Sequence, residues 1–257
     1  MASSQETGHA KNVANFKLIN TRVAGFGATY NPTNPNILIA ALNTKATAAD
    51  AAVKAVQLAE TPYKHAKDMR RVAYDKLNPL VRGAMGILKS SDGFSETTIN
   101  DAFTLAKKIA GTNHPPKKKS GTGTENGQEA AEPTEQSHSV SQQSFDMRLA
   151  NFNDFISILQ TTTWYAPNEA DIQVTALTAF SQTLADTNNT VNETFIPYNA
   201  ALKARDTELY FSQTGLFDIA AKVKSYVSGL NGALGDAEKK QVTSLRFSKP
   251  AKIDTHF

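Results

Sequence analysis

The sequence predicts an all-α protein of two duplicated helical-bundle units with long kinked helices, joined by a disordered linker. Three observations support this prediction. Residues 30–89 and 165–224 match at a constant offset of 135 residues without a gap. Apolar residues recur at helical spacing in both segments, and residues 112–144 between them have almost no apolar content. Self-similarity at a fixed offset is the usual sign of a repeated structural unit.

The match between the two segments rests on eleven identities in sixty paired positions. Both copies contain a Tyr-x-Pro and a Pro-Tyr pair, which composition alone rarely supplies, so we interpret the match as a duplication. The identical residues of the first copy are Tyr30, Pro32, Ile37, Ala41, Leu42, Val56, Pro62, Tyr63, Ala66, Arg70 and Lys89, and each recurs 135 positions later.

The length of 257 residues allows two related halves with a modest core each. We expect a basic helical half at residues 10–111, a flexible linker at 112–144, a slightly acidic helical half at 145–247 and a tail at 248–257. The linker is rich in Gly, Ser, Thr, Pro, Gln and Glu and cannot bury enough apolar surface to offset its chain entropy.

The net charge of +3 is unevenly distributed along the chain. Residues 1–120 carry 17 Lys and Arg against 8 Asp and Glu, residues 121–144 carry only four Glu, and residues 145–257 carry 10 against 12. The two copies therefore differ in charge, and we expect them either to attract one another or to meet different partners.

In the first copy, Val13, Phe16, Ile19 and Val23 mark the apolar face of an opening helix that ends at Gly25 and Gly27. Asn34 and Pro35 then suit the N-cap and first position of a long helix. Further helices are expected from Asn78-Pro79 to Leu88 and after a Ser95 cap.

Pro62 lies inside the long element, where a proline removes an amide donor and clashes with the preceding turn. Thr61 could cap a new helix at Pro62, but Ile196 cannot do so before Pro197 in the second copy. One kinked, nearly continuous helix therefore explains both copies better.

The second copy repeats this plan. It has an opening helix from Phe145 to Leu159, a long element beginning at Asn168, a helix carrying Leu216 to Val227 and ending near Gly229, and a last short helix from Ala237 to Leu245. The stretch 187–194 is rich in Asn and Thr, which lowers its helix propensity.

Four residues at equivalent places are candidates for a repeated contact with a partner: Tyr63 and Arg70, and Tyr198 and Arg205. We favour a structural role, in which each tyrosine packs beside the kink and each arginine pairs with a carboxylate on a neighbouring helix. A basic cluster that includes Lys117, Lys118 and Lys119 could touch phosphate or an acidic lipid surface, but a solvated linker is the preferred interpretation.

No motif supports catalysis, a cofactor or a metal ion. The chain has no cysteine, its five histidines are scattered, and its Gly-x-Gly and serine patterns lack the context of a dinucleotide loop or a nucleophile elbow. We expect no enzyme activity, no cofactor and no metal site. The first residues lack the apolar stretch of a secretory signal and no run is long enough to span a bilayer, so a cytoplasmic location is expected.

Four segments resemble a group of uncharacterised Bacteroidota proteins of similar length with two helical repeats. They are residues 9–16 (HAKNVANF), 144–149 (SFDMRL), 165–171 (YAPNEAD) and 215–224 (GLFDIAAKVK). The resemblance covers most of the chain outside the linker and implies a bacterial origin. It implies no activity and no functional residues.

The sequence therefore favours a non-catalytic helical structural or interaction protein, a scaffold or adaptor that binds a protein partner or a second copy of itself. One alternative is a nucleic-acid-associated protein that uses the basic N-terminal half. A second is a membrane-active helical protein, based on the apolar segments 83–88 and 215–219, although a membrane partner is not expected.

Overall fold

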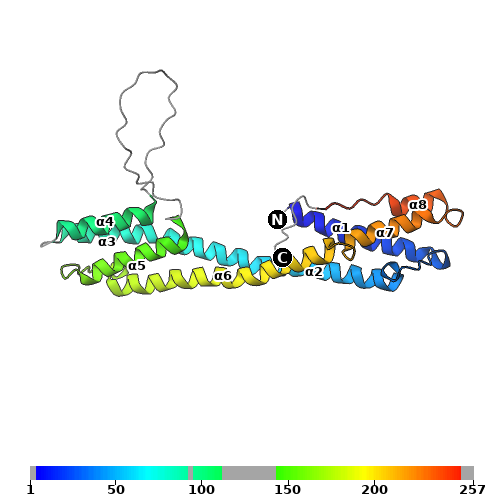
Figure 1. Cartoon of the computed structure of the whole chain (residues 1–257). Helices are drawn as coiled ribbons and strands as arrows, with labels where there is room; N and C mark the ends of the chain where they lie inside the picture. The colour runs from blue at the N-terminus through cyan, green and yellow to red at the C-terminus, as the bar shows by residue number, and fades with distance from the viewer. Residues whose placement is uncertain (1–3, 92–94, 112–142, 250–257) are drawn as a thin grey trace, which may run out of the picture. The chain divides into compact units, whose positions relative to one another are not determined.

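The computed structural model describes residues 4–91, 95–111 and 143–249, and every regular element in these ranges is helical (Figure 1). The all-α class predicted from the sequence is confirmed. The expected linker at 112–144 lies almost entirely outside the described residues, as does most of the tail. None of the helices in the described ranges combines the length and the apolar character that crossing a membrane requires.

Two compact units are present, and each takes residues from both halves of the chain. Unit 1 consists of Met1–Lys64 with Glu193–Phe257, and unit 2 of His65–Asn192. These boundaries differ from the consecutive halves expected at 10–111 and 145–247. The reason is the length of two helices, α2 (Ile39–Asp75) and α6 (Val174–Tyr210), because each contributes one part to unit 1 and the other to unit 2.

Unit 1 is built on α1 (Ser4–Gly25), the short 3-10 turns η1 (Gly27–Thr29) and η2 (Pro35–Ile37), α7 (Leu216–Gly229) and α8 (Asp236–Thr243), with parts of α2 and α6. Helix α7 packs against α1, α8 and η2. The core includes Phe16, Leu42, Leu209 and Val223, all fully buried. Its members come from both ends of the chain, so neither half could close this core alone.

Unit 2 is built on α3 (Leu77–Ser90), α4 (Glu96–Ala110), α5 (Phe145–Thr161) and the 3-10 turn η4 (Ala170–Ile172), with the remaining parts of α2 and α6. Helix α4 packs against both α3 and α5. Ser95 and Ser144 cap α4 and α5 by accepting hydrogen bonds from backbone amides, and Gly111 ends α4 in the left-handed conformation. The separate core of this unit includes Phe152, Phe155 and Leu88.

The long helices continue through their prolines, as predicted. Both are 37 residues long, and Pro62 and Pro197 are each the 24th residue of their helix. The Asn- and Thr-rich stretch 187–194 is helical as well. Its Thr190 hydroxyl donates to the Asp186 carbonyl at 2.8 Å, a bond that lets a threonine satisfy its hydroxyl without leaving the helix.

The starts of the long helices differ from the prediction in detail. Asn34 does act as an N-cap, since its side chain accepts a bond from the Asn36 amide at 3.0 Å, but it caps the 3-10 turn η2, and α2 begins only at Ile39. In the second copy α6 begins at Val174 and not at Asn168. A 3-10 turn occupies the intervening residues in both places, which the apolar spacing alone does not reveal.

One buried hydrogen bond recurs at the offset of 135. The Tyr30 hydroxyl donates to the Ile37 carbonyl at 2.7 Å, and the Tyr165 hydroxyl donates to the Ile172 carbonyl at 2.6 Å. Burial raises the pKa of both phenols, that of Tyr165 to about 12. Each bond closes the turn before a long helix, so these identical residues hold the same local structure in both copies.

The charge difference between the halves is redistributed in the folded units. By residue count, unit 1 carries 15 Lys and Arg against 10 Asp and Glu, and unit 2 carries 12 against 14. The basic first half is thus divided between a unit of charge +5 and a unit of charge −2. The charge difference between the two halves of the sequence therefore does not coincide with the two folded units.

Tyr30→Phe and Tyr165→Phe should each lower the free energy of unfolding by about 1–2 kcal/mol, because each leaves a carbonyl without its partner at little cost in shape. Urea unfolding followed by circular dichroism measures both values. Tyr226→Phe is a useful comparison, since that hydroxyl accepts from the exposed Asn31 amide. A negligible decrease in the free energy of unfolding in both variants would show that the recurring hydrogen bond contributes nothing to stability.

Candidate functional site

Tyr63 and Tyr198, two of the residues predicted from the repeat, contact each other inside unit 1. Their rings stack with centroids 5.3 Å apart and an interplanar angle of 20°, and Phe195 lies 5.4 Å from Tyr63. Both tyrosines are half-buried. The two members of one equivalent pair therefore pack on one another, which agrees with the structural role favoured from the sequence.

Arg70 and Arg205 hold equivalent sequence positions but have different surroundings. The Arg70 guanidinium lies 4.0 Å from the centre of the Phe145 ring, whereas Arg205 is buried and pairs with Asp206 at 2.7 Å. The expected partner was a carboxylate on a neighbouring helix, and Asp206 instead follows Arg205 in the same helix. Lys117, Lys118 and Lys119 lie outside the described residues.

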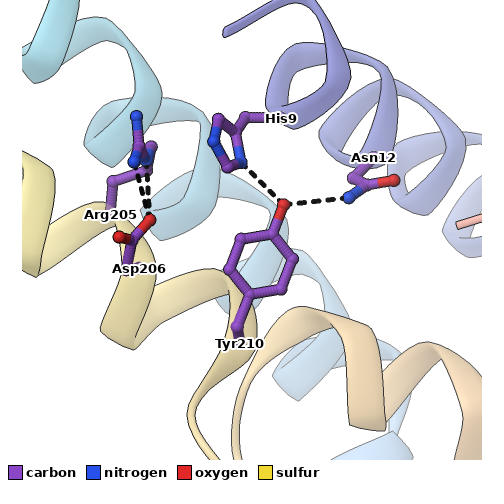
Figure 2. A network of polar contacts seen from close by, with 5 residues as sticks. All are labelled: His9, Asn12, Arg205, Asp206 and Tyr210. Carbon is purple, nitrogen blue, oxygen red and sulfur yellow. Dashed lines mark hydrogen bonds and ion pairs between the residues drawn. The ribbon is translucent and has the colours of Figure 1, made fainter. Parts of the chain in front are cut away.

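A buried polar network lies beside this arginine in unit 1 (Figure 2). Tyr210, the last residue of α6, points its hydroxyl between two side chains of α1. His9 Nδ1 is 2.6 Å from this hydroxyl, and Asn12 Nδ2 donates to it at 3.1 Å. His9, Asn12 and Tyr210 are 3%, 1% and 5% exposed, so water cannot replace these bonds.

The protonation of His9 follows from its burial. Burial lowers the pKa of His9 to about 4, and the positive charge of Arg205 acts in the same direction, while Asp206 opposes it. At neutral pH the imidazole is therefore uncharged, and an unprotonated Nδ1 can accept the hydrogen of the Tyr210 hydroxyl.

Asn12 also holds the C-terminal segment of unit 1. Its Nδ2 donates to the Ser248 carbonyl at 2.7 Å and its Oδ1 accepts from the Ser248 amide at 3.1 Å. One turn later, Asn15 donates to the Arg246 carbonyl at 2.7 Å, and from α7 the Lys224 ammonium contacts the Leu245 carbonyl. The network thus joins α1, α6 and residues 245–248, and each of these hydrogen bonds is made to another residue of the chain.

Sequence reasoning missed this network. His9 was grouped with scattered histidines, although His9, Asn12 and Phe16 are spaced by three and four residues and therefore share the apolar face of α1. That spacing is the sequence signal that could have predicted the burial of His9. The sequence around Tyr210 gives no such signal, because its partners are about two hundred residues away in the chain.

A groove lies between α3 and α4 in unit 2. It has a volume of about 410 Å³, within the usual range for ligand sites. Its lining residues share an apolar floor with polar edges and are Asn78, Val81, Arg82, Met85, Gly86 and Lys89 of α3 with Phe103, Ala106, Lys107 and Ala110 of α4.

The charge of this groove is of one sign. Arg82, Lys89 and Lys107 line it, and no carboxylate does. The Lys89 and Lys107 ammonium groups lie 4.8 and 4.2 Å from the centre of the same ring, that of Phe103, which is 40% exposed. Two cations share one aromatic ring, which attracts each of them but does not neutralise either.

Two hollows of unit 1 differ from the groove because their cations already have partners. In one, Lys45 pairs with Glu208 at 2.9 Å, and both residues line the hollow. In the other, Lys222 donates to the Gln213 carbonyl at 2.8 Å. The groove of unit 2 therefore differs from these two hollows. It combines apolar surface, including the exposed Phe103 ring, with cations that have no carboxylate in the groove lining.

Comparison with known proteins adds no assignment: the chain matches no family model, no curated protein and no solved structure. Within the described ranges, no three His, Asp or Glu residues come together in a way that could hold a metal ion. The candidate site therefore rests on geometry and charge alone.

His9 predicts how stability depends on pH. Its pKa is about 4 in the folded protein and about 6.5 in the unfolded chain, so the unfolded chain takes up a proton first as the pH falls. The contribution of His9 to the free energy of unfolding is complete above pH ~6.5. It decreases by about 3 kcal/mol as the pH is lowered from ~6.5 to ~4.

The difference in free energy of unfolding between the parent protein and His9→Gln should therefore shrink between pH 7 and pH 4, as measured by urea unfolding. His65→Gln is the control, because His65 is exposed. A difference that stays constant over this range would show that His9 accepts a proton as easily when folded as when unfolded.

Proposed function

We propose that this chain is a non-catalytic helical interaction protein built from an internal duplication, and that it binds its partner through the groove between α3 and α4. One observation carries the proposal: the groove combines an apolar lining, in which the Phe103 ring is 40% exposed, with three cations that no carboxylate of its lining neutralises. Exposed apolar surface with a polar rim is typical of interaction sites.

The duplication accounts for the scaffold. The two 37-residue helices, their prolines at equal positions and the recurring tyrosine bond all agree with the offset found in the sequence. The two copies differ in the residues that line the groove. Of its three cations, only Lys89 has an identical counterpart, Lys224, and Arg82 is matched by Phe217.

The buried network of unit 1 supports a structural role for that region. Its histidine, asparagine and tyrosine are bonded to one another and to the C-terminal segment, and none of them lines the groove. A buried and fully connected polar network specifies one arrangement of the helices that it joins. The titratable groups of this network, His9 and Tyr210, are thus used in folding.

Nucleic-acid binding is the second candidate function, because an exposed aromatic ring flanked by lysines can stack on a base. Phe103 with Lys89 and Lys107 is such an arrangement. Titration of a fluorescent oligonucleotide over a salt series tests it. Binding that weakens steeply with salt and is lost in Lys107→Glu would favour this candidate, and no measurable binding would remove it.

The membrane-active alternative is less favoured by the packing of its apolar segments. Ala84, Met85 and Leu88 are buried in unit 2, and Leu216 and Ile219 in unit 1, while Ile87 and Phe217 are partly buried against the same cores. The buried side chains could not insert between lipids without unfolding the units.

Photocrosslinking from the groove tests the proposed function. A benzoylphenylalanine at Thr104, an exposed residue of α4 next to Phe103, borders the groove without filling it. After irradiation in the native cell, we expect a discrete adduct from position 104 and none from the control position Lys203, an exposed residue of unit 1. Equal adducts from both positions, or none from position 104, would contradict the proposal.

A further inference from the structure

We propose that the groove between α3 and α4 receives an acidic amphipathic helix of a partner protein, with apolar side chains on the groove floor and carboxylates at Arg82, Lys89 and Lys107. This inference rests on the proposed function and specifies the chemistry of the partner.

The dimensions of the groove fit a short helix. Its α3 edge is formed by residues 78, 81, 82, 85, 86 and 89, spaced by three and one in alternation, so they form one continuous face of the helix. At 1.5 Å per residue this face is about 16 Å long, the length of about three helical turns. Helix-in-groove recognition uses anchors at this spacing.

Small residues make the floor of the groove accessible. Gly86 of α3 and Ala106 and Ala110 of α4 all line it, and a Cβ at Gly86 would meet no atom within 4 Å. Small side chains let another helix approach closely. Phe103 and Met85 offer larger apolar contacts on either side, although Met85 itself is only 6% exposed.

The charge of the groove selects carboxylates. Lys89 and Lys107 hold two positive charges over one ring, and Arg82 adds a third along the same groove. Bringing a carboxylate between the lysines would offset their mutual repulsion, and the guanidinium of Arg82 suits bidentate binding of a carboxylate. A ligand with acidic residues beside an apolar stripe satisfies both features of the groove.

An extended polyanion fits this site less well. The described residues of unit 2 carry nine Asp and Glu against nine Lys and Arg, so the unit has no net positive field to attract a nucleic acid or an anionic membrane. A base stacking on Phe103 would have to displace a lysine from the ring. A local cluster of cations in a unit without net positive charge favours a ligand with few, well-placed carboxylates.

The equivalent lysine of unit 1 shows which contacts a lysine at this position can make. Lys224, the counterpart of Lys89, lies 5.1 Å from the centre of the Phe247 ring and contacts the Leu245 carbonyl. There the chain's own C-terminal segment supplies both the ring and the acceptor oxygen. At Lys89 a ring is present in Phe103, and the partner would supply the acceptor.

The test uses the full chain and a fluorescein-labelled peptide of about 14 residues, with leucines at helical spacing and glutamates on both flanks. A matched peptide carries glutamine in place of glutamate. Fluorescence anisotropy measures the dissociation constants. We expect the glutamate peptide to bind at least about tenfold more tightly than the glutamine peptide.

Three variants locate the binding in the groove. Gly86→Leu fills the floor, and Arg82→Glu and Lys107→Glu reverse the charge of its edges. Each should weaken binding of the glutamate peptide at least about tenfold. Lys76→Glu changes the charge of unit 2 equally at an exposed residue outside the groove and should leave binding unchanged. Circular dichroism and the unfolding midpoint confirm that each variant is folded.

The remaining outcomes overturn the inference. Equal binding of the two peptides, or unchanged binding in all three groove variants, contradicts an acidic helical ligand. An oligonucleotide or a phosphatidylserine vesicle that binds in a groove-dependent manner, in place of the peptide, assigns the site to a polyanion. Concentration-dependent dimerisation lost in Gly86→Leu, with no peptide binding, assigns it to a second copy. An adduct at position 104 with a non-acidic partner would overturn this inference but leave the proposed function intact.

Discussion

The continuity of two helices through their prolines is the constraint on which the rest of this structure depends. Because α2 and α6 do not break at Pro62 and Pro197, each is long enough to supply apolar residues to two cores. Helix α2 gives Leu42 to unit 1 and Tyr74 to unit 2, and α6 gives Leu184 to unit 2 and Leu209 to unit 1. Breaking either helix would leave both cores incomplete. The two halves of the sequence are therefore not two folding units.

The ends of these helices carry the buried polar contacts. Tyr210 ends α6 and bonds His9 and Asn12 in unit 1, while Tyr74, near the end of α2, accepts from Asn188 at 3.0 Å in unit 2. A buried tyrosine offers a large apolar surface and one polar atom that must be satisfied. In each unit a side chain of a neighbouring helix makes a hydrogen bond to the tyrosine hydroxyl. This bond holds the end of the long helix in one position relative to that neighbour.

The cations on the surfaces of the two units have different partners. Lys45 and Lys222, which line the hollows of unit 1, are paired within the chain, whereas Lys89 and Lys107 of the α3–α4 groove lie over the Phe103 ring and no carboxylate lines that groove. In the proposed duplication, turns and helix lengths are retained while some surface regions of the two copies differ. The proposed binding site lies in such a region, since Phe103 and Lys107 lie beyond the segment in which the copies match.

The sequence by itself determined the helical class, the continuity of the long helices through proline and the Ser95 cap. These follow from local physics: apolar spacing, capping and proline chemistry act within a few residues. Only the tertiary structure decided that each core mixes both halves, that His9 is buried and that Arg82, Lys89 and Lys107 line one groove. Those features depend on contacts between distant residues, and helical spacing shows which face of a helix is buried but not which helix covers it.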